Sequence, residues 1–445
     1  MLVLVGLVGL AGAAFPACGG SSSGGTAGSG GTAGAGGSTT DSVTSSTSSS
    51  GSGGSAATPG CTTTAGTVAN TAAVVAAAQA LAAALTSAQQ STIQLAYELD
   101  NVQQWSNLPT SFIPRNGVML GDMTSDAQKA AVSLVAAAAG TTGSTLFAEL
   151  RAADEFLVTD GHADSSSYGD GRYYIAFVGT PSTTSPWMLQ VAGHHLAYNF
   201  TYNGLCTSAT PLFEGVEPTT WTGADNVAHA PLEAQRAASV AVIGAISSDA
   251  ASLLPGTFTD ILNGPTNQNG KGDARYPAGI TYPTGTTGRG VLVGSLPAAN
   301  QALVKTAIEA WVKNVADPIS TALLADYESD PALAQTYVGY SGAVDLTTKD
   351  SYFRIDGPRV WIEYTIQGGI VYQSRVHYHT IWRDKASDYG ADFADADAGT
   401  TTTTSGGGAG GGPGGAGGGP PFGDAGPPFG DGGPGGPPPA DAGTD

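Results

Sequence analysis

Two long tracts at the ends of this 445-residue chain leave only its middle able to form a hydrophobic core. Residues 19–60 are almost entirely Gly, Ser, Thr and Ala, and residues 396–445 are dominated by Gly, Pro and Asp. Such segments bury too little apolar surface to offset the entropy lost on ordering the chain, so we expect a flexible tether and a disordered tail. Because no second linker interrupts residues 61–395, we expect a single globular domain there.

The first 18 residues have the pattern of an export signal that ends at a cysteine. They read MLVLVGLVGLAGAAFPAC, an apolar stretch too short to span a membrane, which needs about 20 apolar residues. The end of this stretch resembles a bacterial lipobox, in which the thiol of the cysteine, here Cys18, is diacylated. The match is imperfect, because Phe15 and Pro16 precede Ala17 and no Lys or Arg occurs before Arg115. We expect an exported lipoprotein of the outer membrane or, as the alternative, a chain cleaved near Ala17 and secreted to the periplasm or the extracellular space.

The negative net charge of the chain argues against some classes of binding partner. The chain has a formal net charge of −20, with 16 Lys and Arg residues against 36 Asp and Glu residues, and its basic residues form no cluster in the sequence. A protein that binds nucleic acid neutralises phosphates with clustered cations, so we expect no nucleic acid as a partner. A membrane is expected as a partner only through the lipid anchor.

The chain has three cysteines to assign. If Cys18 carries lipid, Cys61 and Cys206 remain as a pair in an oxidising compartment, where disulfides persist. A disulfide between them would close a loop of about 145 residues and stabilise the domain by about 2–4 kcal/mol. The alternative is that both thiols are free.

Segments rich in Ala and Leu predict helices in both halves of the domain. Residues 67–103 are expected to be helical with a break near Thr86 and Ser87, because Ala and Leu are strong helix formers. The sequence from Ser125 to Gln128 has the pattern of a capping box and opens a helix that runs to Ala139. Further helices are expected over residues 145–157, 230–247, 297–314 and 318–327.

Runs rich in aromatic and β-branched residues predict antiparallel strands in the middle of the domain and a hairpin at its end. These runs cover residues 172–178, 187–202, 208–214, 360–366 and 370–382. Helices followed by strands, more helices and a last hairpin indicate an α+β fold. We expect N-terminal helices, central antiparallel strands and a C-terminal β-hairpin packed with helices.

The hairpin register decides which way its histidines point. Gly368 and Gly369 favour a two-residue turn, which pairs Val360 with His377. That register places His377 and His379 on the apolar face that also carries Val360. A slip of one residue in the turn would invert this assignment.

Four of the six histidines occur as two pairs within strand-like segments. His194 and His195 are adjacent, so one of them is expected to point into the core, whereas His377 and His379 are two apart and share a strand face. Three imidazoles are a common donor set for zinc, copper or iron, and an open fourth position would allow catalysis. The alternative is that these are structural histidines hydrogen-bonded to Tyr, Asn or carboxylates.

Carboxylates and arginines lie close to these histidines in the sequence. Glu214 is the candidate catalytic residue, as a ligand, a partner of a ligand or a general base, whereas Glu217 is expected to be a loop carboxylate in water. Charged residues also bracket the hairpin, and we favour ion pairs among them over the binding of a carboxylate or phosphate group. These residues are Arg354, Asp356, Arg359, Arg383 and Asp384.

Several long motifs, in order along the chain, resemble the DUF3500 family. They are YIAFVGTP at 174–181, PW at 186–187, GHHLAYN at 193–199, PLFEG at 211–215, YFRIDGPRVWIE at 352–363 and HYHTIWRD at 377–384. The resemblance covers about residues 90–390. It implies a secreted domain and brings no established chemistry.

Two functions are compatible with these patterns. The first is a cell-envelope enzyme with a transition metal held by His194 or His195 together with His377 and His379, and with Glu214 nearby; hydrolytic and oxidative chemistry both fit. The second is a non-catalytic surface module that binds a small polar ligand or an envelope partner through the same cleft. Metal ligation requires the two histidine segments to converge on one point, so a structure that shows or excludes this convergence distinguishes the two functions.

Overall fold

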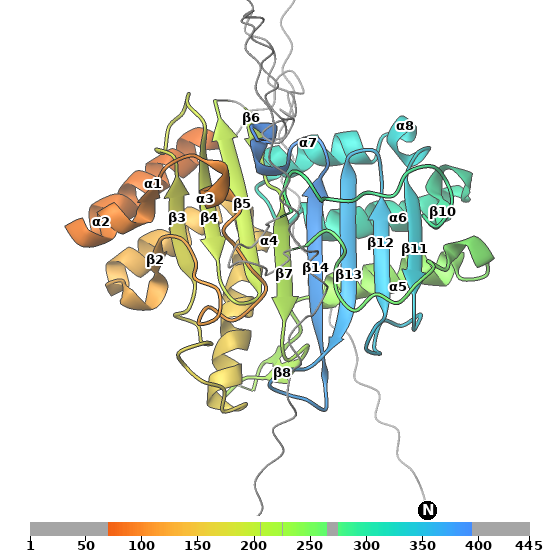
Figure 1. The fold of residues 1–445 in the computed structure, drawn as a ribbon, viewed down its shortest axis with the longest axis horizontal. Helices are drawn as coiled ribbons and strands as arrows, with labels where there is room; N and C mark the ends of the chain where they lie inside the picture. The colour runs from red at the N-terminus through yellow and green to blue at the C-terminus, as the bar shows by residue number, and fades with distance from the viewer. Residues whose placement is uncertain (1–69, 205, 225, 265–274, 394–445) are drawn as a thin grey trace, which may run out of the picture. The chain divides into compact units, whose positions relative to one another are not determined.

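The structure is a computed structural model that describes residues 70–393 except 205, 225 and 265–274 (Figure 1). The expected signal segment (1–18), tether (19–60) and tail (396–445) lie outside the described residues. Their boundaries therefore stay predictions.

A large sheet forms the centre of the fold, and its path contains ten strands. In order across the sheet they are β1 (Gln94–Leu95), β3 (Tyr174–Val178), β4 (Trp187–Ala192), β5 (Leu196–Asn203), β7 (Leu212–Val216), β14 (Val376–Asp384), β13 (Val360–Gly368), β12 (Tyr352–Asp356), β11 (Tyr337–Ser341) and β10 (Val291–Leu292). Two short strands pair beside this path, β2 (Val118–Met119) with β3 and β6 (Cys206–Ser208) with β5. A separate ribbon joins β8 (Trp221–Thr222) to β9 (Ala228–His229). Apart from the parallel β1–β3 pair, the strand pairs of the described residues are antiparallel.

The helices of the described residues follow the Ala- and Leu-rich segments. They are α1 (Thr71–Ala84), α2 (Ser87–Ile93), α3 (Leu99–Val102), α4 (Ser125–Thr159), α5 (Glu233–Ile246), α6 (Ala298–Val312), α7 (Asp317–Tyr327) and α8 (Asp330–Leu333). The break expected near Thr86 is present, because Thr86 caps α2 in a reciprocal capping box with Gln89. The combination of these helices with the antiparallel sheet confirms the α+β fold class.

Helix α4 joins two of the expected helices around one glycine. Gly140 has φ 67° and ψ −170°, a backbone conformation that side chains rarely adopt, and it interrupts the helical geometry between the two segments. The expected cap was wrong by one residue, because Thr124 rather than Ser125 accepts the hydrogen bond from the Ala127 N–H. By length and composition α4 could cross a membrane, but it packs one face, including Leu134 and Leu150, into the core, as a core helix of a folded domain does.

The two faces of the sheet differ in chemistry. Alternate residues such as Tyr198 and Thr380 point to the face covered by helices, where Tyr198 bonds to the Gly143 carbonyl of α4 and Trp311 of α6 bonds to Thr380. These helices lie behind the sheet in the view of Figure 1. The opposite face is covered by loops and carries most of the buried polar side chains of β13 and β14.

The expected register of the last hairpin was wrong. His377 pairs with Gln367 and Val360 pairs with Asp384, because residues 369–375 form a longer connection than the two-residue turn that Gly368 and Gly369 suggested. The shift is odd in number, so it moves both histidines of β14 to the opposite face from Val360.

Seven strands of the described residues were not predicted, namely β1, β2 and β8 to β12; β1 lies in the stretch expected to be helical, and the run expected at 187–202 is two strands, β4 and β5. β11 contains Gly339, which weakens a strand pattern, and β10 is only two residues long. Strands β10, β11 and β12 extend the sheet beyond the hairpin, so the hairpin lies inside the sheet rather than at its edge.

Candidate metal centre

Three histidines from two distant segments meet on the loop-covered face of the sheet. His377 and His379 project from β14, and His195 lies in the turn between β4 and β5. β7 lies between these segments and pairs with both β5 and β14. Gly215 of β7 stands opposite His379, and a Cβ at Gly215 would lie 2.8 Å from Cδ2 of His195. The missing side chain leaves the space that the His195 ring occupies.

The Nε2 atoms of these three rings converge. The His377 and His379 Nε2 atoms are 3.2 Å apart, and the His379 and His195 Nε2 atoms are 3.3 Å apart. All three residues are buried, and one ligand atom from each lies within 4.8 Å of the others. Tetrahedral zinc with Zn–N bonds of about 2.0–2.1 Å separates its nitrogens by about 3.3–3.4 Å, so the spacing fits three ligands of one ion.

Acceptors on the far side of two rings orient them. Nδ1 of His377 lies 2.8 Å from the Gly368 carbonyl, and Nδ1 of His379 lies 3.2 Å from Oδ1 of Asp260. A carbonyl or an ionised carboxylate can only accept, so each Nδ1 carries the proton and each Nε2 presents a lone pair. The two lone pairs therefore face each other at 3.2 Å, an arrangement that a shared cation stabilises.

Burial favours the neutral form of two of the three converging rings, His195 and His377. Burial lowers the pKa of His195 well below its ordinary value, and the neighbouring His194, His379 and His377 lower it further. Burial also lowers the pKa of His377 to about 3, with His379 as the next cause. Neutral imidazole is the form that binds a metal, so these rings are ready to act as ligands at neutral pH.

His194 is close to this cluster but does not converge with it. Its ring stacks on that of His195, with centroids 3.7 Å apart and planes 23° apart, so the in-plane lone pairs of the two rings run side by side. Its Nδ1 lies 3.1 Å from Oδ1 of the buried Asp154 on α4. Asp154, His194 and His195 form a second group with metal-binding atoms within 4.8 Å, but stacked rings aim poorly at a common ion. The expectation that one of the adjacent histidines points inward was too narrow, since both are buried in a turn.

Glu214 lies on the helix-covered face, away from the three histidines. Its neighbours on β7, Phe213 and Gly215, share the histidine face, whereas Glu214 accepts hydrogen bonds from Tyr198 and Asn314. Burial raises its pKa to about 8. The expected contact of Glu214 with the histidines was wrong, because strand alternation sends its side chain through to the other face.

Glu217, expected to be a loop carboxylate in water, is buried and bonded. Its Oε1 accepts the backbone N–H groups of Ile370, Val371 and Tyr372, each at 2.8 Å. Three backbone donors on one carboxylate oxygen fix the connection between β13 and β14. This connection directly follows Gly368, whose carbonyl orients His377.

Three residues beside the histidine rings were not predicted from the sequence; two of them are buried, and Asp260 is partly exposed. They are Asp154, Asp260 and Asn107; the Asn107 Nδ2 donates to Oδ2 of Asp260 at 3.4 Å and only lies near Nδ1 of His379, because that nitrogen carries the proton it donates to Asp260. Burial acts to raise the pKa of Asp260, but its interactions with His379 and the Ile261 N–H outweigh burial and lower it overall. Asp260 and Asn107 lie in irregular segments without a motif, so only the tertiary fold could reveal them.

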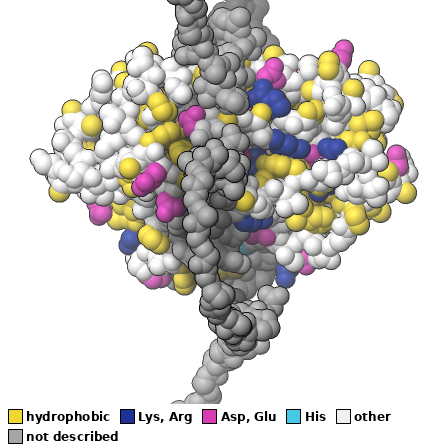
Figure 2. Space-filling model, turned by 45° about the horizontal axis from the view of Figure 1, so that its top comes forward, with side chains coloured by type: hydrophobic (Ala, Val, Ile, Leu, Met, Phe, Trp, Pro, Cys, Tyr) yellow, Lys and Arg dark blue, Asp and Glu magenta, His cyan; other side chains and the backbone are white. Residues whose placement is uncertain are grey.

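Of the ion pairs expected among the charged residues around the hairpin, the structure contains the one between Arg359 and Asp384, whereas Arg354 donates to the Gly288 carbonyl and the other pairs use partners outside that set. Arg359 bonds to Asp384 and Asp326, and Arg383 bonds to Asp388. Asp356 accepts from both Arg289 and Lys385 at 2.6 Å. On the face drawn in Figure 2, Lys and Arg side chains occur in small groups rather than as one continuous basic patch.

The structure describes one of the three cysteines, so it tests the cysteine predictions only in part. Cys206 lies on β6 and takes part in a disulfide. Cys18 and Cys61 lie outside the described residues, so lipid on Cys18 and the pairing of Cys61 with Cys206 stay predictions.

The comparisons with known proteins give a family and no chemistry. Residues 67–391 match the model of a family described as "Protein of unknown function (DUF3500)". No curated protein and no solved structure matches the chain. The match spans well over half of the chain and contains all three converging histidines, and the chain therefore belongs to the DUF3500 family.

Proposed function

We propose that this protein is a metal-dependent hydrolytic enzyme whose zinc ion is held by His195, His377 and His379. The observation that carries the proposal is the convergence of the three Nε2 atoms, at 3.2 and 3.3 Å, on one buried point. Nδ1 contacts to a backbone carbonyl and to Asp260 support it, because metal-binding histidines usually donate their second N–H to such acceptors.

The donor set favours zinc over the other two candidate metals. Copper(II) prefers a square or tetragonal arrangement, and non-haem iron sites commonly combine two histidines with a carboxylate. Asp260, the carboxylate that contacts the cluster, bonds to Nδ1 of His379 rather than lying with the Nε2 atoms. Three imidazole nitrogens, with two of their separations at the tetrahedral spacing, match the three-histidine ligand set of one class of catalytic zinc sites.

Three protein ligands leave a fourth position for water or substrate. Zinc held by three neutral imidazoles lowers the pKa of a bound water to about 7 and polarises carbonyl or phosphoryl oxygens. The protein's part is to hold the rings, through Gly368 and Asp260, and to surround them with packed side chains such as Phe213, which meets the His379 ring edge to face. We place this centre in an exported protein, tethered through Cys18 or secreted, as the sequence suggests.

Metal analysis tests the centre directly. Protein purified without a His-tag and reconstituted with zinc should hold about one equivalent per chain. His377→Ala and His379→Ala should lose it, whereas His162→Ala, at an exposed histidine outside the cluster, should retain it. Less than about a tenth of an equivalent of zinc, copper or iron in the reconstituted wild type would overturn the proposal.

Activity is tested separately with simple probes. The zinc-loaded protein should hydrolyse p-nitrophenyl acetate or bis(p-nitrophenyl) phosphate, and His379→Ala should reduce that rate to the background rate. A protein that binds one equivalent of zinc and hydrolyses neither probe would contradict the hydrolytic assignment and favour the non-catalytic binding module. If the purified protein instead holds one equivalent of copper or iron and catalyses an oxidation, the proposed metal is that ion and not zinc.

A further inference from the structure

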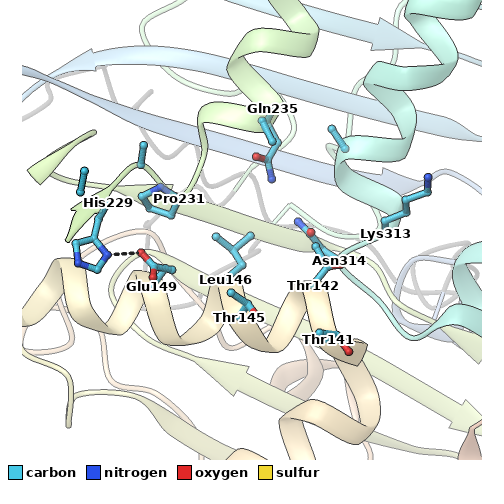
Figure 3. Close-up of a pocket in the computed structure, with 14 residues that line it drawn as sticks. Thr141, Thr142, Thr145, Leu146, Glu149, His229, Pro231, Gln235, Lys313 and Asn314 are labelled. Atoms are coloured by element: carbon cyan, nitrogen blue, oxygen red, sulfur yellow. Dashed lines mark hydrogen bonds and ion pairs between the residues drawn. The ribbon is translucent and has the colours of Figure 1, made fainter. Parts of the chain in front are cut away.

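A hollow lies on the helix-covered side of the fold. Its volume is about 670 Å³, and it is bounded by α4, α5, α6 and the end of β9 (Figure 3). None of the three converging histidines lines it. A hollow of this size suits a small organic ligand, since ligand sites commonly span about 300–1,000 Å³.

Gln235 of α5 is a buried polar group in this hollow whose side chain makes no hydrogen bond among the described residues. The residue is only 3% exposed, its side chain points from α5 into the hollow in Figure 3, and its Oε1 accepts no hydrogen bond within the described part of the chain. An amide buried without a hydrogen-bond partner destabilises a fold, so such groups in native proteins usually have a partner in the protein, in water or in a ligand. Oε1 itself has almost no accessible surface, whereas Nε2, which also makes no hydrogen bond among the described residues, is the end of the amide from which a ligand oxygen in the hollow would accept a hydrogen bond.

The rest of the lining is uncharged in sum and rich in hydroxyl groups. Glu149 bonds to His229 at 2.8 Å, and Lys313 bonds to Glu309 at 2.8 Å, so each ionic group at the hollow already has a counterpart. Three exposed threonines on one stretch of α4 add hydroxyl groups that make no side-chain hydrogen bond among the described residues; they are Thr141, Thr142 and Thr145. Apolar side chains such as Leu146 and Pro231 complete the walls. The ligand that fits is neutral, offers several donors and acceptors, and has an apolar face.

A further hollow of about 500 Å³ continues along the same helix. It shares His229 with the first hollow and is lined by α4 from Ala148 to Thr159 and by Trp221. His229 stacks on Trp221 with ring centroids 4.6 Å apart, which places this pair at the boundary between the two hollows. In this second hollow Arg151 is paired with Asp170 at 3.5 Å, and the remaining carboxylate, Glu155, accepts a hydrogen bond from the Asp170 N–H. Together the hollows follow α4 from Thr141 to Thr159, about 28 Å at 1.5 Å per residue, which suits a chain-like ligand.

We propose that the two hollows along α4 form a binding groove for a neutral oligosaccharide. Sugar hydroxyl groups both donate and accept, which matches the free amide of Gln235 and the threonine hydroxyl groups. The C–H faces of sugar rings match the apolar walls at Leu146 and Pro231. Ligand binding here is independent of the metal centre, because no residue is shared between them.

Titration of the full chain with linear neutral sugars tests the groove. Isothermal titration should show binding of maltohexaose or cellohexaose, and weaker binding of glucose, because a single ring fills only part of the groove. Gln235→Leu keeps the size of the side chain and removes the amide, so it should weaken hexasaccharide binding by about tenfold, roughly the contribution of one or two hydrogen bonds. Thr142→Val, at an exposed position that cannot disrupt the core, should weaken it by about threefold.

Gln335→Leu is the matched control, because Gln335 is exposed and lines neither hollow. It should leave saccharide affinity unchanged, and protein stripped with a chelator should bind as well as zinc-loaded protein. The proposal is overturned if neither hexasaccharide binds, or if Gln235→Leu and Thr142→Val, both with wild-type melting temperatures, bind as tightly as the wild type.

Discussion

Burial raises the pKa of the Glu214 carboxyl group, an effect that its position in the sequence does not reveal. Its carboxyl group lies between Tyr198 and Asn314, and burial raises its pKa to about 8, against an ordinary value of 4.5. The folded protein therefore keeps a proton that the unfolded chain loses above about pH 4.5. Stability contributed by this site is fully present below pH 4.5 and is lost as the pH rises towards 8.

Glu214→Gln should remove this pH dependence. The variant's melting temperature relative to the wild type should rise between pH 5 and pH 8, in line with a difference of up to a few kcal/mol, because Gln cannot ionise. Thermal unfolding at pH 5, 6.5 and 8 measures the change, and Glu98→Gln, at an exposed position, serves as the control. If the wild type and Glu214→Gln show parallel pH profiles, Glu214 is not protonated in the folded state.

The connection between β13 and β14 shows how one buried carboxylate can position a site. Oε1 of Glu217 holds the N–H groups of residues 370–372, next to Gly368, whose carbonyl orients His377. Glu217→Ala should therefore weaken zinc affinity by about tenfold, the lower end of the effect of losing support behind a ligand. Competition with a chromophoric chelator measures the affinity, and Glu98→Ala is the control. Unchanged zinc affinity in a folded Glu217→Ala protein would show that the connection does not position His377.

The local sequence pattern predicted whether a main segment is a helix or a strand better than it predicted which strands pair and in which register. Ala-rich runs gave α1, α4 and α6, and the break near Thr86 followed from its capping chemistry. The Gly368 and Gly369 pair did not set the hairpin register, because Glu217, distant in sequence, stabilises a longer connection. A contact of this kind leaves no local signal, so the face occupied by His377 could not be read from the hairpin alone.

At the scale of the whole molecule, the sequence singled out the three converging histidines as candidate metal ligands but not what brings them together. His195, His377 and His379 were candidates from their spacing, whereas their convergence depends on β7 lying between β5 and β14. Gly215 then opens the space for His195, and its role is visible only once the three strands are side by side. Glu214, adjacent in sequence to Gly215, was a misleading candidate because strand alternation turned it away.

This arrangement makes a bound metal a link between the two halves of the sheet. One ligand comes from the β4–β5 turn and two come from β14, so an ion that binds only the folded state should stabilise the whole domain. At a free zinc concentration about 1,000 times the Kd, the gain is about 4 kcal/mol, which raises the melting temperature by several degrees in a domain of this size. Thermal unfolding of the full chain with EDTA, and again after zinc is restored, measures this gain. His379→Ala should melt at one temperature under both conditions, and a wild type equally indifferent to zinc would mean that the three rings meet without holding a metal.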